Sequence, residues 1–82
     1  MNKWLFHFRT PVGVVWIAPH PQQPGRVLLG FRNQVLGPYP SPKSAAGDVH
    51  LGHSGSTELD DYATTNYAIP EDVSEWEQGD LE

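Results

Sequence analysis

The 82-residue chain contains no cysteine, which excludes disulfide scaffolds, thiolate metal sites and thiol nucleophiles. No apolar run approaches the roughly 20 residues of a membrane-spanning helix, so we expect no membrane partner. Lys3 and Arg9 stand among alternating aromatic side chains rather than before an apolar stretch. This is not the pattern of a signal peptide, and we expect a cytoplasmic protein.

Basic residues are few and lie unevenly along the chain, with five Lys and Arg against ten Asp and Glu. Residues 1–57 contain all of the basic residues and one acid, Asp48, whereas residues 58–82 contain every other acid. This asymmetry predicts a tail that either extends or lies on its own basic half, and short-range attraction favours docking. We expect the acids of the segment that begins near Pro70 to lie near Arg9, Arg26 or Arg32.

The length allows one small domain, whose first half predicts an antiparallel sheet of three or four strands. Aromatic side chains alternate with other residues in residues 3–9, and residues 14–17 are β-branched or aromatic. Alternation returns in residues 26–32, and Val35-Leu36 is either a short fourth strand or the return of a hairpin. Residues 19–25 contain three prolines, which lack the N–H that a sheet requires, so this stretch is a loop.

Capping residues predict a helix after the sheet. Ser41 is a favourable N-cap, Pro42 suits the first helical position, and Gly52 can end the helix. Alternation in the strands and helical spacing then place one set of apolar residues in a common core. If Leu5 and His7 lay beneath the helix instead, this register would be wrong by one residue. The predicted core contains Trp4, Phe6, Phe8, Val27, Leu29, Phe31, Ala45, Ala46 and Val49.

The second half is less apolar. Residues 53–66 are rich in Gly, Ser, Thr, Asp and Asn and predict a flexible loop after a core of residues 1–52. Within residues 67–80 we expect a short acidic helix, roughly Pro70 to Gln78, that docks on the core. The complete prediction is therefore an α+β fold. The final Leu81-Glu82 resembles the residues that a cloning site leaves, so we expect these two not to be native.

Several spaced motifs extend over nearly the whole chain. They are Thr10-Pro11-x-Gly13-x-x-Trp16-Ile17, Leu36-Gly37-x-Tyr39-x-Ser41-Pro42-x-x-Ala45-Ala46-x-Asp48-Val49, a Gly52-x-x-Gly55 loop, and Pro70-x-Asp72-x-Ser74-x-Trp76. This pattern resembles that of a family of short bacterial proteins, which implies no particular activity because that family has none established. The strand and Ser-capped helix in the middle also look like the DNA-binding domains of the plant AP2 and integrase-arm type, a similarity that reflects a common way to pack a helix on a sheet.

Metal binding and catalysis have weak support. His50 and His53 have the spacing of helical metal ligands only if the helix continues past Gly52, so we expect no metal site. Ser54 follows no strand and cannot form a nucleophile elbow. We therefore expect no catalytic residue, no cofactor and no enzymatic activity.

The aromatic and basic residues are the better candidates for function. Trp76 stands among acids and could anchor a partner, since tryptophan is frequent in binding hot spots. A core this small also needs its large side chains for packing. The candidate interaction residues are Trp76, Val73, Trp16, Tyr39, Arg9, Arg26 and Arg32.

Three functions follow from these candidates. The first is a non-catalytic module that binds an unidentified protein partner, with its oligomeric state left open. The second is an acidic inhibitor or nucleic-acid mimic, of the kind that phages and mobile elements use against host defence, acting on a basic partner. The third is tail-regulated nucleic-acid binding through a basic sheet face, although the pI of about 5.1 argues against nucleic acid as a partner. Steep weakening of binding with salt would favour the second or third.

Overall fold

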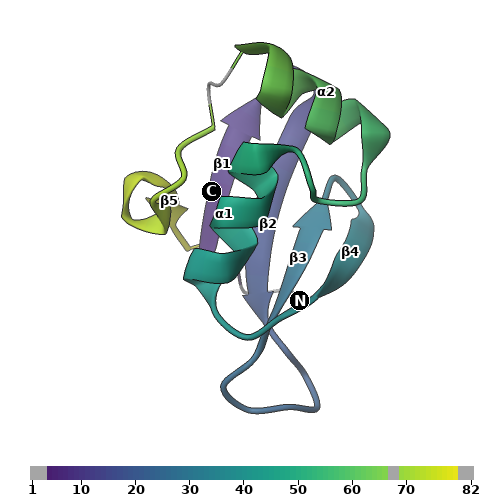
Figure 1. Ribbon diagram of the computed structural model, residues 1–82. Helices are drawn as coiled ribbons and strands as arrows, with labels where there is room; N and C mark the ends of the chain where they lie inside the picture. Colours follow the sequence, from purple (N-terminus) through teal and green to yellow (C-terminus); the bar gives the residue numbers. More distant parts are fainter. Residues whose placement is uncertain (1–3, 67–68, 80–82) are drawn as a thin grey trace.

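Four consecutive strands and one short C-terminal strand form a single antiparallel sheet in the computed structural model, which describes residues 4–66 and 69–79 (Figure 1). The strand order is β4-β3-β2-β1-β5. The strands are β1 (Phe6–Thr10), β2 (Gly13–Pro19), β3 (Val27–Phe31), β4 (Gln34–Tyr39) and β5 (Glu77–Gln78). The helices are α1 (Pro42–Leu51), α2 (Thr57–Asn66) and the 3₁₀ turn η1 (Val73–Glu75). The predicted α+β class is confirmed; the sheet has one strand more than the three or four predicted, and the second α-helix covers residues 57–66 instead of the C-terminal segment.

Helix α1 begins and ends where its capping residues predict. The Ser41 hydroxyl accepts the N–H of Ser44 at 3.2 Å, and Pro42 occupies the first turn. Gly52 ends the helix with a φ of 79°, in the left-handed region that glycine adopts without a steric penalty. Its N–H bonds the carbonyl of Val49 at 3.1 Å.

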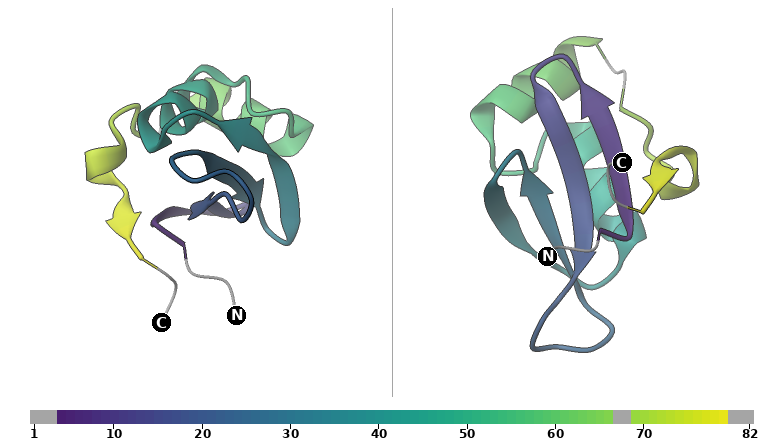
Figure 2. Two further views of the ribbon diagram at one scale, coloured as in Figure 1. Left: turned by 90° about the horizontal axis from the view of Figure 1, so that it is seen from below. Right: turned by 180° about the vertical axis from the view of Figure 1, so that it is seen from behind.

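The hydrophobic core lies between the sheet and the two α-helices, which cover the same sheet face (Figure 2). Phe6 and Phe8 pack against this core together with alternate residues of β2 and β3, as the register predicts. Trp4 does not, because the chain bends at Leu5 and Trp4 lies on the other face. The buried core residues are Val15, Ile17, Val27, Leu29, Phe31, Ala45, Ala46, Val49, Leu59, Ala63, Ile69 and Trp76.

The prediction of a loop over residues 53–66 is wrong for residues 57–66, which form α2. Leu59 and Ala63 are four residues apart, face the core and are almost completely buried. The hydroxyl of Ser56 accepts the N–H of Leu59 at 3.4 Å at the start of the helix. Tertiary packing of two apolar residues thus makes a helix in a polar sequence, and the core includes residues beyond 52.

The prediction of an acidic C-terminal helix is also wrong. Asp72 accepts the N–H of Ser74 at 3.0 Å and begins only the 3₁₀ turn η1, after which the chain is extended at Trp76. Residues 77 and 78 then pair with β1 as β5, which adds the fifth strand. Docking of this segment is nevertheless as predicted, since Trp76 is only 3% exposed.

Among residues 69–79, no acid lies within ion-pair distance of Arg9, Arg26 or Arg32. Arg32 pairs instead with Glu58 of α2, at 2.9 Å. Residues 67, 68 and 80 of the predicted segment, and the predicted vector residues Leu81 and Glu82, lie outside the described residues. Across the described ranges, no helix is both long and apolar enough to cross a membrane.

Candidate functional site

The sheet has a second face that neither α-helix covers. From behind, β1 to β4 lie in front of both α-helices (Figure 2, right). The pairing register assigns residues to this face, since directly paired residues of antiparallel strands point to the same side. We call it the open face, and it comprises His7, Arg9, Val14, Trp16, Ala18, Leu28, Gly30, Val35 and Pro38, with Trp4 packed on it.

Two tryptophans lie flat on the open face. The Trp16 indole crosses β3 at Gly30 and donates its Nε1–H to the carbonyl of Arg32 at 2.8 Å. A Cβ at Gly30 would lie 2.0 Å from Cζ2 of Trp16, so only glycine leaves room for the ring. Trp4 stacks on Trp16, with ring centroids 5.6 Å apart and an interplanar angle of 4°. Trp16 is 7% exposed and Trp4 half-buried, so Trp4 is the more accessible ring.

His7 joins the open face to the C-terminal segment. Its ring is 2% exposed and lies 5.9 Å from that of Trp4. Nδ1 lies 2.6 Å from the carbonyl of Gly79, and because a carbonyl only accepts, Nδ1 is the donor. Nε2 faces Glu77 at 3.9 Å and makes no hydrogen bond within the described residues. His7 therefore fixes β5 beside β1.

The charge on the open face is basic. Arg9 lies on β1 opposite Val14, and Arg26 precedes β3 with the same parity as Leu28. Both arginines are exposed. No open-face position on β1 to β4 is an Asp or Glu, and Glu77 of β5 lies at the margin.

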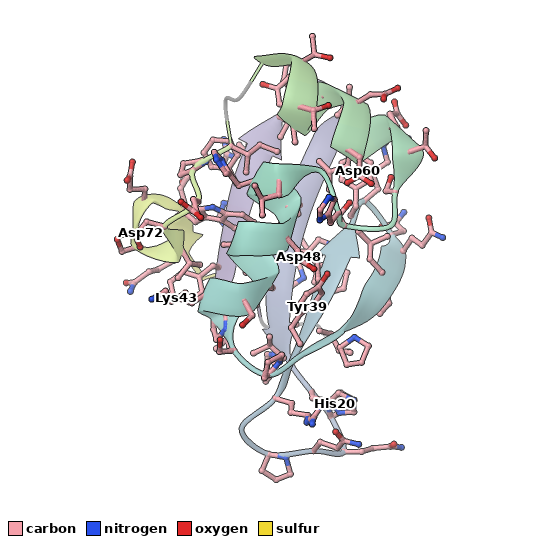
Figure 3. All side chains as sticks on the ribbon, viewed as in Figure 1. His20, Tyr39, Lys43, Asp48, Asp60 and Asp72 are labelled. Atoms are coloured by element: carbon pink, nitrogen blue, oxygen red, sulfur yellow. The ribbon has the colours of Figure 1, made fainter. Side chains whose placement is uncertain are left out.

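The predicted candidate Tyr39 lies on the opposite, helix-covered side (Figure 3). Its hydroxyl donates to Oδ2 of Asp48 in α1 at 2.9 Å. Burial and this hydrogen bond to a carboxylate raise the pKa of Tyr39 to about 12. Tyr39 thus joins β4 to α1 and is not a free contact residue.

Beside α1, a depression of about 440 Å³ separates the helix from the C-terminal segment (Figure 3). Lys43 and Gly47 line one wall, and Glu71 and Asp72 line the other. The Ser74 N–H holds the pKa of Asp72 below its ordinary value, so this carboxylate already serves as a cap. The depression is therefore lined by two acids and a lysine at the surface, and none of these lining residues is a buried polar group that would select a ligand.

The structure separates the predicted candidates instead of bringing them together. Trp76 is buried against Phe8, with ring centroids 6.0 Å apart, and donates Nε1–H to the carbonyl of Pro70 at 3.0 Å. Trp76 is therefore a core residue and not an exposed anchor, and Val73 packs against the same core. Arg32 bonds the carbonyl of Val12 and Glu58. Of the candidate set, the open face contains Trp16 and Arg9, and Arg26 directly precedes β3 at one end of that face.

The histidines considered as metal ligands have separate places. His50 is at the end of α1, where Nδ1 donates to the carbonyl of Ile69 at 2.8 Å, and His53 follows the glycine that ends the helix. Within residues 4–66 and 69–79, no three His, Asp or Glu side chains are grouped so that they could hold a metal ion.

Sequence reasoning missed Trp4, Leu28 and Val35 as surface residues. A signal for Leu28 exists in β3, where Val27, Leu28 and Leu29 are consecutive apolar residues and so supply apolar side chains to both faces. No family model, no curated protein and no solved structure matches this chain. The resemblance to short bacterial proteins and to AP2 or integrase-arm domains stays a prediction.

Proposed function

We propose that this chain is a small non-catalytic module that binds a protein partner through the open face of its sheet. The observation that carries the proposal is the apolar character of a face that no helix covers. Val35 is 53% exposed there, and Pro38, Leu28 and Trp4 add further apolar surface to the same face. Exposed apolar patches with polar margins are typical of protein-interaction sites.

The polar groups support a binding role over a catalytic one, because most of them are already engaged in structural contacts. Asp60 accepts the N–H and the hydroxyl of Ser54 at 2.9 and 2.6 Å. Asp48 holds Tyr39, and His7 and His50 bond backbone carbonyls of the C-terminal segment. These groups order loops and join elements, whereas a general acid or base must be free to exchange a proton with a substrate.

An acidic inhibitor or nucleic-acid mimic is the second candidate, and the distribution of acids favours it. Every described Asp and Glu except Glu77 lies in α1, α2 or the segment between residues 69 and 76. Such a mimic would bind a basic partner through the helix side. Between about 50 mM and about 500 mM salt, the affinity of a partner for the open face should fall only by the contribution of Arg9 and Arg26. The affinity of a basic partner for a nucleic-acid mimic should fall steeply over the same range.

Tail-regulated nucleic-acid binding has less support. The described tail pairs with the edge of β1 and leaves Arg9 and Arg26 uncovered, so it does not occupy the basic face. With Arg32 held by Glu58, two arginines are few for a phosphate backbone.

Site-specific photo-crosslinking tests the proposed function. A photoreactive phenylalanine analogue replaces Val35 on the open face or, as a control, Leu51 at the end of α1, which is 55% exposed. In a lysate of the organism that encodes the protein, we expect a discrete adduct from position 35 and none from position 51. The adduct should disappear when Leu28→Ser is added, because that change removes apolar surface from the same face. Equal adducts from both positions, or one insensitive to Leu28→Ser, would contradict the proposal.

A further inference from the structure

The open face presents the apolar side chains of Leu28, Val35 and Pro38 together with two arginines that form no ion pair within the described chain. Arg9 and Arg26 are both exposed, and neither lies within ion-pair distance of a described carboxylate. The other described basic residues are used elsewhere, since Arg32 pairs with Glu58 and Lys43 lies near Asp72. Within residues 4–66 and 69–79, the positive charges of Arg9 and Arg26 are therefore available to a partner.

The register fixes where these charges lie. Arg9 is opposite Val14 on β2, whereas Arg26 lies beside His20, whose N–H donates to the Arg26 carbonyl at 3.0 Å. From Val14 to His20 the chain advances six residues, or about 20 Å along the strands. Two strand spacings, about 10 Å, separate them across the sheet. The arginines thus stand near opposite ends of the open face, with Trp16 and Leu28 between them and Val35 to one side, on β4.

We infer that the open face binds an acidic, extended segment of another protein, in which two carboxylates about six residues apart flank apolar or aromatic side chains. The carboxylates pair with Arg9 and Arg26 while the apolar side chains contact Leu28, Val35 and the exposed edge of Trp4. Opposite charges at the ends set the orientation of the segment, and the apolar contact supplies most of the affinity. This inference rests on the proposed function and names the class of partner.

A protein segment fits this surface better than the alternatives. A nucleic acid carries a phosphate every few ångströms, and most of these would lie over apolar side chains without a cation. A second copy packed face to face would bring the same unneutralised arginines together. A segment with charges only at its ends meets both features of the surface.

Selection from an unbiased peptide library tests the inference. Random dodecapeptides on phage are selected on the intact protein and counter-selected on the double variant Leu28→Ser/Val35→Ser. If that variant fails to fold by circular dichroism, Val35→Ser alone replaces it, because this side chain is 53% exposed. Enriched peptides are then measured by fluorescence polarisation against the wild type, Arg9→Gln/Arg26→Gln and, as a matched basic control, Lys43→Gln.

We expect enriched peptides to have Asp or Glu on both sides of an apolar run. Because one exposed ion pair changes a binding constant by up to about fivefold, the double arginine variant should bind about 5- to 20-fold more weakly. Lys43→Gln should bind as tightly as the wild type.

The experiment distinguishes failure of this inference from failure of the proposed function. Peptides that need Leu28 and Val35 but are neutral or basic, or that bind Arg9→Gln/Arg26→Gln within twofold of the wild type, would overturn the inference and leave the proposed function intact. Efficient displacement of the peptide by an oligothymidylate of similar length would assign the surface to nucleic acid instead. An absence of any peptide that depends on the open face would overturn both.

Discussion

Replacing Trp76 by alanine should lower the free energy of unfolding by about 3–5 kcal/mol. Its indole is only 3% exposed, contacts Phe8 and bonds the carbonyl of Pro70, so truncation leaves a large cavity and removes a hydrogen bond. Since small domains have a total stability of about 5–15 kcal/mol, the loss is a large fraction of the whole. Urea unfolding followed by tryptophan fluorescence and circular dichroism measures it.

The neighbouring residue provides the control. Glu75→Ala changes an exposed side chain and should alter stability by less than about 0.5 kcal/mol. If Trp76→Ala prevents folding altogether, Trp76→Phe keeps most of the volume and should give a smaller, measurable loss. A Trp76→Ala protein within about 1 kcal/mol of the wild type would show that the C-terminal segment is not part of the core.

Replacing Gly30 by alanine should destabilise the sheet by about 3 kcal/mol, at the upper end of overpacking effects. The added Cβ would lie 2.0 Å from Cζ2 of Trp16, so the ring must leave β3 and give up its hydrogen bond to the carbonyl of Arg32. We expect a red-shifted tryptophan emission together with the lower urea midpoint, because Trp16 and the stacked Trp4 become more exposed.

Gly37→Ala is the matched control, since Gly37 lies in β4 of the same sheet and a Cβ there meets no atom within 4 Å. It should leave stability within about 0.5 kcal/mol of the wild type. In a Trp16→Val background, Gly30→Ala should cost far less, because the ring that it displaces is absent. An additive double variant would mean that the Trp16 ring does not pack on Gly30.

Local signals explain the parts of the fold that the sequence predicts. Ser41, Pro42 and Gly52 act on their own neighbours, so the bounds of α1 follow from a few residues. Alternation likewise identifies β1 to β3, because side-chain direction along a strand depends only on position. This rule does not apply to Trp4, because the chain bends at Leu5 and interrupts the alternation before β1 begins.

The elements that sequence analysis missed depend on contacts between distant residues. Helix α2 is stabilised because Leu59 and Ala63 are buried in the core. Few apolar residues lie near them in the sequence, so the sequence gives little indication of this helix. Strand β5 has two residues and is defined by its pairing with β1, about 70 positions away. The sequence names Trp16, Arg9 and Arg26 as candidates, but the packing of the Trp16 ring on Gly30 and Trp4 depends on distant strands and could not be predicted from it.

Amide proton–nitrogen shift mapping tests the central claim, binding through the open face, most directly. The ligand is the partner identified by the position-35 adduct, added to the isotope-labelled intact protein. We expect the largest shift changes at Arg9, Leu28 and Val35 and small ones along α1 and α2. Largest changes at Lys43 or at the acids of α2 would contradict the claim and move the binding surface to the helix side.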